Sequence, residues 1–504
     1  MEKVALLAAL TVLLSSSAAF ANHLVDYENP VRTSAEDEIK SLPNLNDPIT
    51  FRQYSGYLKA DQKGSKFLHY WFVEAAEDPA NKPVLLWLNG GPGCSSMEGL
   101  FSELGPFALN SDGTEVSLRK YSWNKLANVI FLESPAGVGF SYSKKLLNFE
   151  SDDKAAMENY LALKSFFEKF PQYKGNSLFL SGESYAGVYL PTLGVLIDAD
   201  KDFNLKGLAI GNGYLDAKKL SESLIFFGYH HGLLGKTTWD EVSAKCCGGK
   251  PPARANCVLG DNHVPAACSN AISDKMEEAL SEPGMNPYNM YGDCPTSKYA
   301  SNANNSSSLT RWHVDKQLRA IVNRRHQNND HEKPFEILKL AELAHASKLG
   351  GPPCFDGDNM ITYLNTRDVR RAVHIPDRVG RWNVCNNLNY GVKYPIRPGG
   401  LAPQIRALIA SPRKLSLLVF NGDTDLVCNA LGDEWFVDDL GRKLIADYQP
   451  WKVNKQIAGW VKHYDGITFA TVRGAGHMVP EFRPREAYAM ISIVLNSTSH
   501  NVYL

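Results

Sequence analysis

Short apolar runs recur along the chain, and each ends in a turn rich in glycine or small polar residues. They are Val84–Leu88, Val129–Leu132, Ser177–Leu180, Leu205–Ile210, Leu415–Phe420 and Ile467–Val472. Runs of this length, bounded in this way, predict strands that are buried on both faces of a sheet. Residues 152–170 instead place apolar side chains at three- and four-residue spacing, which predicts an amphipathic helix. The alternation predicts an α/β fold with a central mixed, mostly parallel sheet covered by helices.

Residues 216–353 interrupt this alternation, because strand-then-glycine units are missing there. The stretch holds five of the nine cysteines, a polar tract at 304–308 and a basic run that begins at Arg311. We interpret it as a cap domain inserted into the α/β core, whose two parts are 22–215 and 354–504. The polar segment 311–333 is a candidate site for proteolytic nicking of the cap, since nicking concentrates in exposed polar segments.

The first residues have the order of a secretory signal peptide. Lys3 precedes the apolar run Val4–Leu14, and Ala19-Phe20-Ala21 gives a cleavage pattern after residue 21. The alternative is a membrane anchor, but the run is shorter than the roughly 20 residues that a spanning helix needs. We therefore predict a signal peptide at 1–21, no membrane span, and entry into the secretory pathway. The final location, lysosome, vacuole or extracellular space, stays open.

The composition of the chain limits which partners, cofactors and cellular compartments can be expected. The 504 residues include 53 basic and 54 acidic side chains, a formal net charge of −1, which gives no reason to expect nucleic acid as a partner. Nine cysteines suit an oxidising compartment, and their odd number leaves at least one unpaired within the chain. No C-x-x-C pair occurs, so we expect no metal site and no cofactor. Glycosylation sequons begin at Asn304, Asn305 and Asn496.

One of the glycine-rich turns has the form of a nucleophile elbow. Gly182-Glu183-Ser184-Tyr185-Ala186-Gly187 follows a predicted strand and opens a helix-like segment. Small flanking residues permit the sharp turn that presents the serine as a nucleophile, although alanine replaces the usual second glycine. Taken alone, the motif could equally be a glycine-rich turn that carries an ordinary serine.

Two further turns supply what a nucleophilic serine needs. Asp425 and His477 each follow a predicted strand, and the chain order Ser184, Asp425, His477 is that of α/β-hydrolases. Either residue by itself would be read as a turn former, but three matches in the correct order favour a catalytic triad. The early loop Asn89-Gly90-Gly91-Pro92-Gly93 completes the set. We expect the amides of Gly91 and Tyr185 to form the oxyanion hole.

Together, four motifs resemble the serine carboxypeptidase family. They are the loop 89–96, the elbow 182–187, Asn421-Gly422-Asp423-Thr424-Asp425 and Gly476-His477-Met478-Val479-Pro480. The resemblance implies an α/β-hydrolase fold and hydrolysis of the C-terminal bond of peptides through an acyl-enzyme on Ser184. It also implies that Asn89, Glu183 and Glu103 bind the substrate carboxylate and that Met478 lines the pocket of the leaving residue. Glutamates can do this only when protonated, so activity is expected in acid.

The resemblance implies more than the site. It pairs Cys94 with Cys385, Cys294 with Cys354, Cys246 with Cys268 and Cys247 with Cys257, and leaves Cys428 unpaired. Some relatives transfer the acyl group to an alcohol, and others stabilise partner glycosidases, so both roles stay open for this chain, as does a homodimer. An intact carboxylate-binding set favours a peptidase over an acyltransferase.

Overall fold

The computed structural model describes residues 30–144, 151–257, 284–294, 354–386, 399–497 and 500–504, with Leu259, Cys268, Lys275, Met276 and Ala279. The predicted signal peptide, the sequons at Asn304 and Asn305 and the predicted nicking segment 311–333 lie outside the described residues. Asn496 is exposed at the end of the last helix. Among the described residues, no helix combines the length and the apolar character that crossing a bilayer requires.

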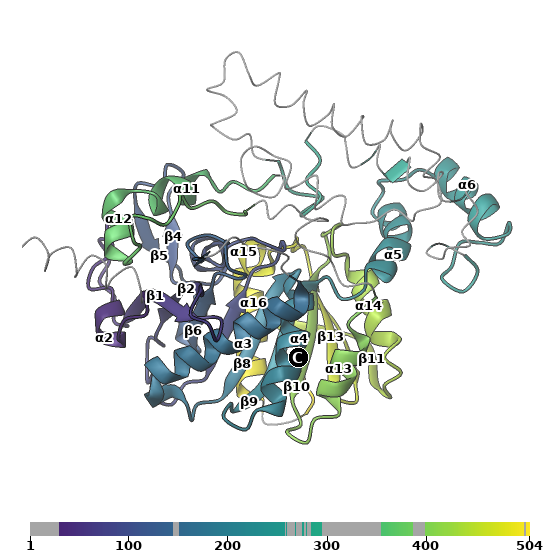
Figure 1. Ribbon diagram of the computed structural model, residues 1–504. Coiled ribbons are helices and arrows are strands. Elements are labelled where there is room, and N and C mark those ends of the chain that lie inside the picture. The colour runs from purple at the N-terminus through teal and green to yellow at the C-terminus, as the bar shows by residue number, and fades with distance from the viewer. Residues whose placement is uncertain are drawn as a thin grey trace, which may run out of the picture.

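In the described part of the chain, eleven strands form one sheet (Figure 1). The strand order is β1-β2-β6-β3-β8-β9-β10-β13-β12-β11, with β7 paired to β2. Neighbouring strands from β6 to β13 in this order run parallel, and antiparallel strands flank them on both sides. The bounds are β1 Gln53–Lys59, β2 Lys66–Val73, β3 Val84–Leu88, β6 Asn128–Leu132, β7 Tyr142–Ser143, β8 Leu178–Ser184, β9 Leu205–Gly213, β10 Ser416–Gly422, β11 Leu444–Val453, β12 Gln456–Tyr464 and β13 Ile467–Val472. The predicted mixed α/β sheet is confirmed.

Helices cover both faces of this sheet. Leu86 and Leu180 pack in one core with α3 Asp152–Lys169, α4 Ala186–Ala199, α5 Ala217–His230, α13 Ala402–Ile409 and α14 Ala430–Asp438. Leu85 and Trp87 pack in a second core with the π-helix η1 Gly99–Glu103, α11 Asp358–Leu364, α12 Arg367–Ala372 and α16 Pro484–Asn496. Adjacent residues of β3 thus enter opposite cores, which is why the predicted strands are apolar throughout.

The helix predicted at 152–170 shows how local sequence sets these elements. Ser151 caps α3, its side chain accepting from the amide of Lys154, and Asp152 and Asp153 lie in the first turn. An acidic first turn is favourable beside the positive end of the helix dipole. The helix stops at Lys169, just before Pro171, which cannot continue it. The buried phenylalanines of its last turns then pack on the sheet.

Between β9 and Cys354 the described chain forms α5, α6 Lys236–Cys246 and a segment at 284–294. Two disulfides, Cys246–Cys268 and Cys247–Cys257, lie in this stretch, and Cys294–Cys354 closes it. A fourth disulfide joins Cys94 to Cys385, which are 291 residues apart in the sequence. These are the pairs that the family resemblance implies, and Cys428 is a buried free thiol.

A small hairpin, β4 Phe107–Leu109 with β5 Val116–Leu118, lies apart from the main sheet. It follows η1 and carries the chain to Arg119, which matters for the site below.

Candidate active site

Ser184 lies at a sharp turn between β8 and α4. Its φ of 63° is in the left-handed region, which costs energy for a residue with a side chain and is sustained only by its surroundings. A Cβ on Gly182 would lie 2.2 Å from the carbonyl oxygen of Leu88, and one on Gly187 would lie 2.6 Å from the amide of Tyr214. The two glycines are therefore required for the close packing of this turn. Ser184 itself is partly exposed while its neighbours are buried.

His477 and Asp425 meet beside this turn. His477 Nδ1 lies 2.6 Å from Asp425 Oδ2, and both side chains are buried. The two residues follow β13 and β10, which are paired in the sheet, so their loops emerge at the same edge. The segment at 284–294 supports the loops: the amide of His477 donates to the carbonyl of Tyr288 over 2.7 Å, and their rings are 4.9 Å apart.

The carboxylate of Asp425 is held by further donors. Oδ2 also accepts from Asn212 Nδ2 at 2.9 Å and from the amide of Cys428 at 3.1 Å, and Oδ1 accepts from the amide of Val427 at 2.9 Å. With these donors converging on it, the carboxylate acts as an acceptor, so His477 carries its proton on Nδ1 and keeps Nε2 free to accept another. Asn212 ends β9, between the serine and aspartate strands.

Sequence reasoning missed Asn212. A signal was present, because Gly211-Asn212-Gly213 is another polar turn at the end of an apolar run. Its Oδ1 accepts from the amide of Gly422, so the side chain bridges two strand ends and orients the aspartate loop.

The loop at 89–93 packs directly against the elbow. A Cβ on Gly90 would lie 2.4 Å from the amide nitrogen of Tyr185 and 2.6 Å from Ser184 Cβ. Gly91 has φ of 110°, and the Cys94–Cys385 disulfide follows it. The two residues predicted as oxyanion donors, Gly91 and Tyr185, therefore belong to segments in contact beside the serine. Glycine allows this approach because it has no side chain.

Asn89, Glu103 and Glu183 form a buried cluster next to the elbow. Asn89 Nδ2 donates to Glu103 Oε1 at 2.9 Å and to Glu183 Oε1 at 3.1 Å. Its Oδ1 accepts from Trp87 Nε1 at 2.7 Å and from the amide of Gly99 at 3.1 Å, which fixes the orientation of the amide. Oxygen atoms of Glu103 and Glu183 lie close together, and each carboxyl group affects the pKa of the other. Glu103, which could have been a helix-surface residue, is buried on η1.

Burial favours the protonated form of the carboxyl groups in this cluster. It raises the pKa of Glu103, and it raises the pKa of Glu183 well above the usual range, with repulsion from Glu103 as the second cause. Glu98, which sequence reasoning did not single out, is buried beside them and its pKa is raised in the same way. One oxygen of each of the two predicted glutamates, Oε2, is buried without a hydrogen-bond partner. These groups are poised to donate to an added acceptor.

Oxygen atoms of Glu98, Glu103 and Glu183 lie within 4.8 Å of one another, a spacing that a metal ion could bridge. Asn89, however, presents its NH₂ group to this cluster and not its oxygen. A donor there suits an anionic ligand such as a carboxylate and repels a cation. The chemistry of the cluster therefore fits the terminal carboxylate of a peptide.

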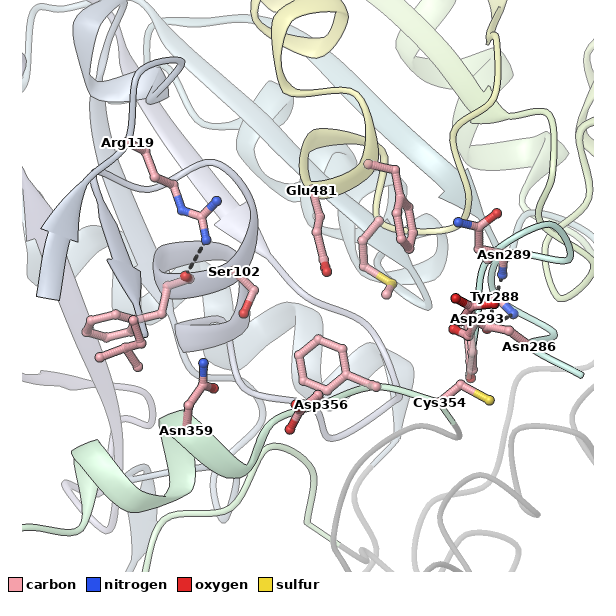
Figure 2. A pocket seen from close by; sticks show the side chains of 16 residues that line it. Ser102, Arg119, Asn286, Tyr288, Asn289, Asp293, Cys354, Asp356, Asn359 and Glu481 are labelled. Atoms are coloured by element: carbon pink, nitrogen blue, oxygen red, sulfur yellow. Dashed lines mark hydrogen bonds between the residues drawn. The ribbon is translucent and has the colours of Figure 1, made fainter. Parts of the chain in front are cut away.

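A cavity of about 510 Å³ opens beside these groups (Figure 2). Met478, predicted to line the pocket of the leaving residue, is one of its walls, and Tyr288, Arg119 and Glu481 are others. Ser102, also in the wall, immediately precedes Glu103. The cavity is thus linked to His477 through Tyr288, whose ring lies 4.9 Å from the histidine ring, and to Glu103 through its neighbour in the chain, Ser102.

Known proteins share this chain's sequence and fold. The lysosomal protective protein of Mus musculus is 42% identical over 469 residues, covering 92% of this chain and 94% of the relative. Serine carboxypeptidase ctsa-4.1 of Caenorhabditis elegans is 36% identical over 478 residues, covering 93% and 94%. The crystal structure of KEX1(DELTA)P, a prohormone-processing carboxypeptidase from Saccharomyces cerevisiae, has a TM-score of 0.67 at 23% identity, covering 92% of this chain and 97% of the other. This likeness shows the shared fold.

The family profile described as serine carboxypeptidase matches residues 43–497, which includes every residue of the site described above. This match, together with two relatives that are more than 30% identical over most of their length, establishes the family to which the chain belongs. The chain belongs to the serine carboxypeptidase family and is a serine-type carboxypeptidase.

Proposed function

We propose that this enzyme removes the C-terminal residue of peptides at acid pH, through an acyl-enzyme on Ser184. The observation that carries the proposal is the Asn89 amide held between two buried carboxyl groups, next to the serine turn. An endopeptidase has no need for an anion site there. Such a cluster, close to the elbow, selects substrates whose scissile bond lies one residue from a free carboxylate.

The geometry suggests the following steps. His477 Nε2 takes the proton of Ser184 Oγ as this oxygen attacks the scissile carbonyl, and Asp425 stabilises the imidazolium that forms. Gly91 and Tyr185 donate their amides to the oxyanion. The C–N bond then breaks, and the leaving amino acid takes the proton from His477 Nε2. A water molecule, activated by the same nitrogen, attacks the ester and releases the shortened peptide.

Acid dependence follows from the carboxylate cluster. Below their raised pKa values, Glu103 and Glu183 are neutral and can donate hydrogen bonds to a substrate carboxylate. As pH rises through those values the glutamates ionise, and two negative groups then face the negative substrate. Binding of a free C-terminus is therefore lost on the alkaline side, whereas an ester or amide lacking that carboxylate escapes the repulsion.

We expect kcat/KM for a blocked dipeptide to fall from pH 5 to pH 8 relative to kcat/KM for the matching ester. The ratio of the two values removes the pH dependence that both substrates share. Glu183→Gln should flatten the ratio, because an amide donates a hydrogen bond at every pH. The measurement is a pair of pH profiles, with and without the substitution.

The matched control is Glu158→Gln. Glu158 is a buried glutamate that pairs with Lys66 and is absent from the carboxylate cluster. Its substitution should leave the pH dependence of the ratio as in the wild type. Parallel profiles for peptide and ester in the wild-type enzyme would count against the role given to Glu103 and Glu183.

We extend the proposal to organisation and location. Residues 216–353, with α5 and α6, are assigned to a cap inserted between 22–215 and 354–504 of the hydrolase core. The disulfides and the named location of the mouse relative support the secretory pathway and the lysosome. Nicking within 311–333 would leave the fragments joined, because Cys94–Cys385 and Cys294–Cys354 connect the two sides.

The resemblance to the family leaves open a second role, in which this chain stabilises partner glycosidases. Neither that role nor a homodimer requires the catalytic triad. Both are tested by asking whether a glycosidase, or a second copy of this chain, co-purifies with the Ser184→Ala variant. An acyltransferase is distinguished by adding an alcohol to the peptidase assay: ester product in place of free acid would identify it. The buried carboxylate cluster favours hydrolysis of free C-termini.

A further inference from the structure

The cavity beside Met478 lies where the side chain of the leaving residue must go. A C-terminal residue bound by Asn89 and Glu103 has its α-carboxylate in the cluster and its peptide bond at Ser184. Its side chain can then enter the cavity, since Ser102 and Tyr288 join the cavity walls to the cluster and to His477. This placement rests on the proposed function.

Glu481 is a partly buried glutamate in the wall of this cavity. It lies on the short helix α15 Val479–Phe482, and Figure 2 shows its side chain reaching into the space between Arg119 and Tyr288. Its Oε2 is buried and has no hydrogen-bond partner. Burial, with Glu103 as the second cause, raises the pKa of Glu481 to about 8. An unpartnered buried carboxyl group of this kind is costly unless a ligand completes it.

The charged groups around Glu481 favour a cation as that ligand. Asp293 and Asp356 also line the cavity and are exposed at its rim, and Glu98 and Glu103 lie behind it. Arg119 is the basic side chain of the wall, but Nε donates to the carbonyl of Phe107 at 2.9 Å and a terminal nitrogen to that of Phe101 at 2.6 Å. Two of its nitrogens are thus committed to the backbone, and among the described residues no ion pair joins Arg119 to Glu481, although the charge of Arg119 opposes the rise in the pKa of Glu481.

We propose that this cavity receives the side chain of the leaving C-terminal residue and that Glu481, in its ionised form, makes the enzyme select lysine or arginine there. The ammonium or guanidinium group would supply the hydrogen bond and the counter-charge that Oε2 lacks. Met478, Phe482 and Tyr288 would pack against the methylene stem, as apolar surfaces do for long basic side chains.

The selection depends on pH in a direction opposite to the overall activity. In acid, Glu481 is neutral and offers a hydrogen bond but no charge, so lysine and an uncharged side chain of equal length differ little. As pH rises toward 8, Glu481 ionises and attracts the cation. The preference for lysine over its neutral analogue should therefore grow while total activity on free C-termini falls.

The experiment compares two blocked dipeptides that differ only in the last residue, lysine or norleucine. The ratio of kcat/KM for lysine to kcat/KM for norleucine should rise from pH 5 to pH 8 and reach about tenfold at pH 8. A tenfold preference is the effect expected of one charge pair that is shielded from water. Glu481→Gln should lower the ratio at pH 8 by about tenfold and make it independent of pH. Glu434→Gln is the matched control, since this partly buried glutamate pairs with Lys462 and lies outside the cavity wall.

A ratio that is the same at both pH values and in Glu481→Gln, with both dipeptides cleaved, would overturn the inference and leave the carboxypeptidase intact. Cleavage of neither dipeptide, with the ester still hydrolysed, would overturn the proposed function and the inference with it. If Glu481→Gln does not fold, the inference is tested by measuring how strongly free lysine and free norleucine inhibit the wild-type enzyme. Lysine must then become the better inhibitor between pH 5 and pH 8.

Discussion

Ser184→Ala should lower kcat/KM on a blocked dipeptide by about 10⁴- to 10⁶-fold, the usual loss when the nucleophile of a triad is removed. Ser184 ends β8 in a backbone conformation that presents its side chain at the sheet edge, beside the Gly90–Gly91 loop. Alanine tolerates the same turn and removes only the attacking oxygen. The assay is release of the free amino acid at pH 5, with circular dichroism to check the fold.

Ser181→Ala provides the matched control on the same strand. Ser181 is buried, and its hydroxyl donates to the carbonyl of Ala209 at 2.9 Å, so its loss costs one hydrogen bond, about 1 kcal/mol of stability. Activity should stay near the wild-type value. An organophosphonate should label wild type and Ser181→Ala but not Ser184→Ala. Label on Ser184→Ala, together with retained hydrolysis, would identify another nucleophile.

Asp425→Asn should lower kcat by about 10⁴-fold, because the amide leaves the histidine in the wrong tautomer. In the wild type, Oδ2 accepts from His477, Asn212 and the amide of Cys428. An amide NH₂ at that place faces donors and cannot accept, so His477 no longer keeps its proton on Nδ1. The measurement is kcat by steady-state kinetics across pH 4 to 8.

Asp433→Asn is the control for loss of a buried aspartate. Asp433 Oδ2 accepts from Asn421 Nδ2 at 2.8 Å and from the amide of Gly213 at 3.0 Å, close to the triad but without contact to His477. Burial raises the pKa of Asp433 well above the usual range, which favours its neutral form, and asparagine keeps an oxygen that can accept from both donors. A loss as large as that of Asp425→Asn would mean that any polar change at this sheet edge disables the enzyme.

The central strands could be predicted because both of their faces are buried. β3, β10 and β13 are apolar throughout and end in polar turns, and the sequence places each within a residue or two of its bounds. β1, β2, β11 and β12 were not predicted, although β1 and β2 are almost wholly buried. Most of β11 is exposed, with Trp451 as its buried residue, and Tyr448 stacks on Trp460 outside the core. Strands that lie on a solvent-facing edge have no apolar run to reveal them.

The triad could be proposed from sequence because each member follows a strand and the order is diagnostic. The carboxylate cluster could not be derived in that way. Glu103 ends a five-residue π-helix, which leaves no periodic signature, and its role came from the resemblance to the family. Glu98, Asn212 and Glu481 were not assigned to the site. Their importance lies in burial and in partners from distant strands, which spacing along one chain does not encode.

The strand order has a consequence for biosynthesis. β10 lies between β9 and β13, so the sheet stays open at β9 until the last third of the chain is made. Asp425 follows its partner Asn212 by 213 residues, which takes a ribosome roughly 10 to 40 s at ordinary elongation rates. During that interval the nascent chain has its serine turn but no base, and thus cannot cleave its neighbours. It also exposes the apolar edge of β9, a template for aggregation that a chaperone must cover until β10 arrives.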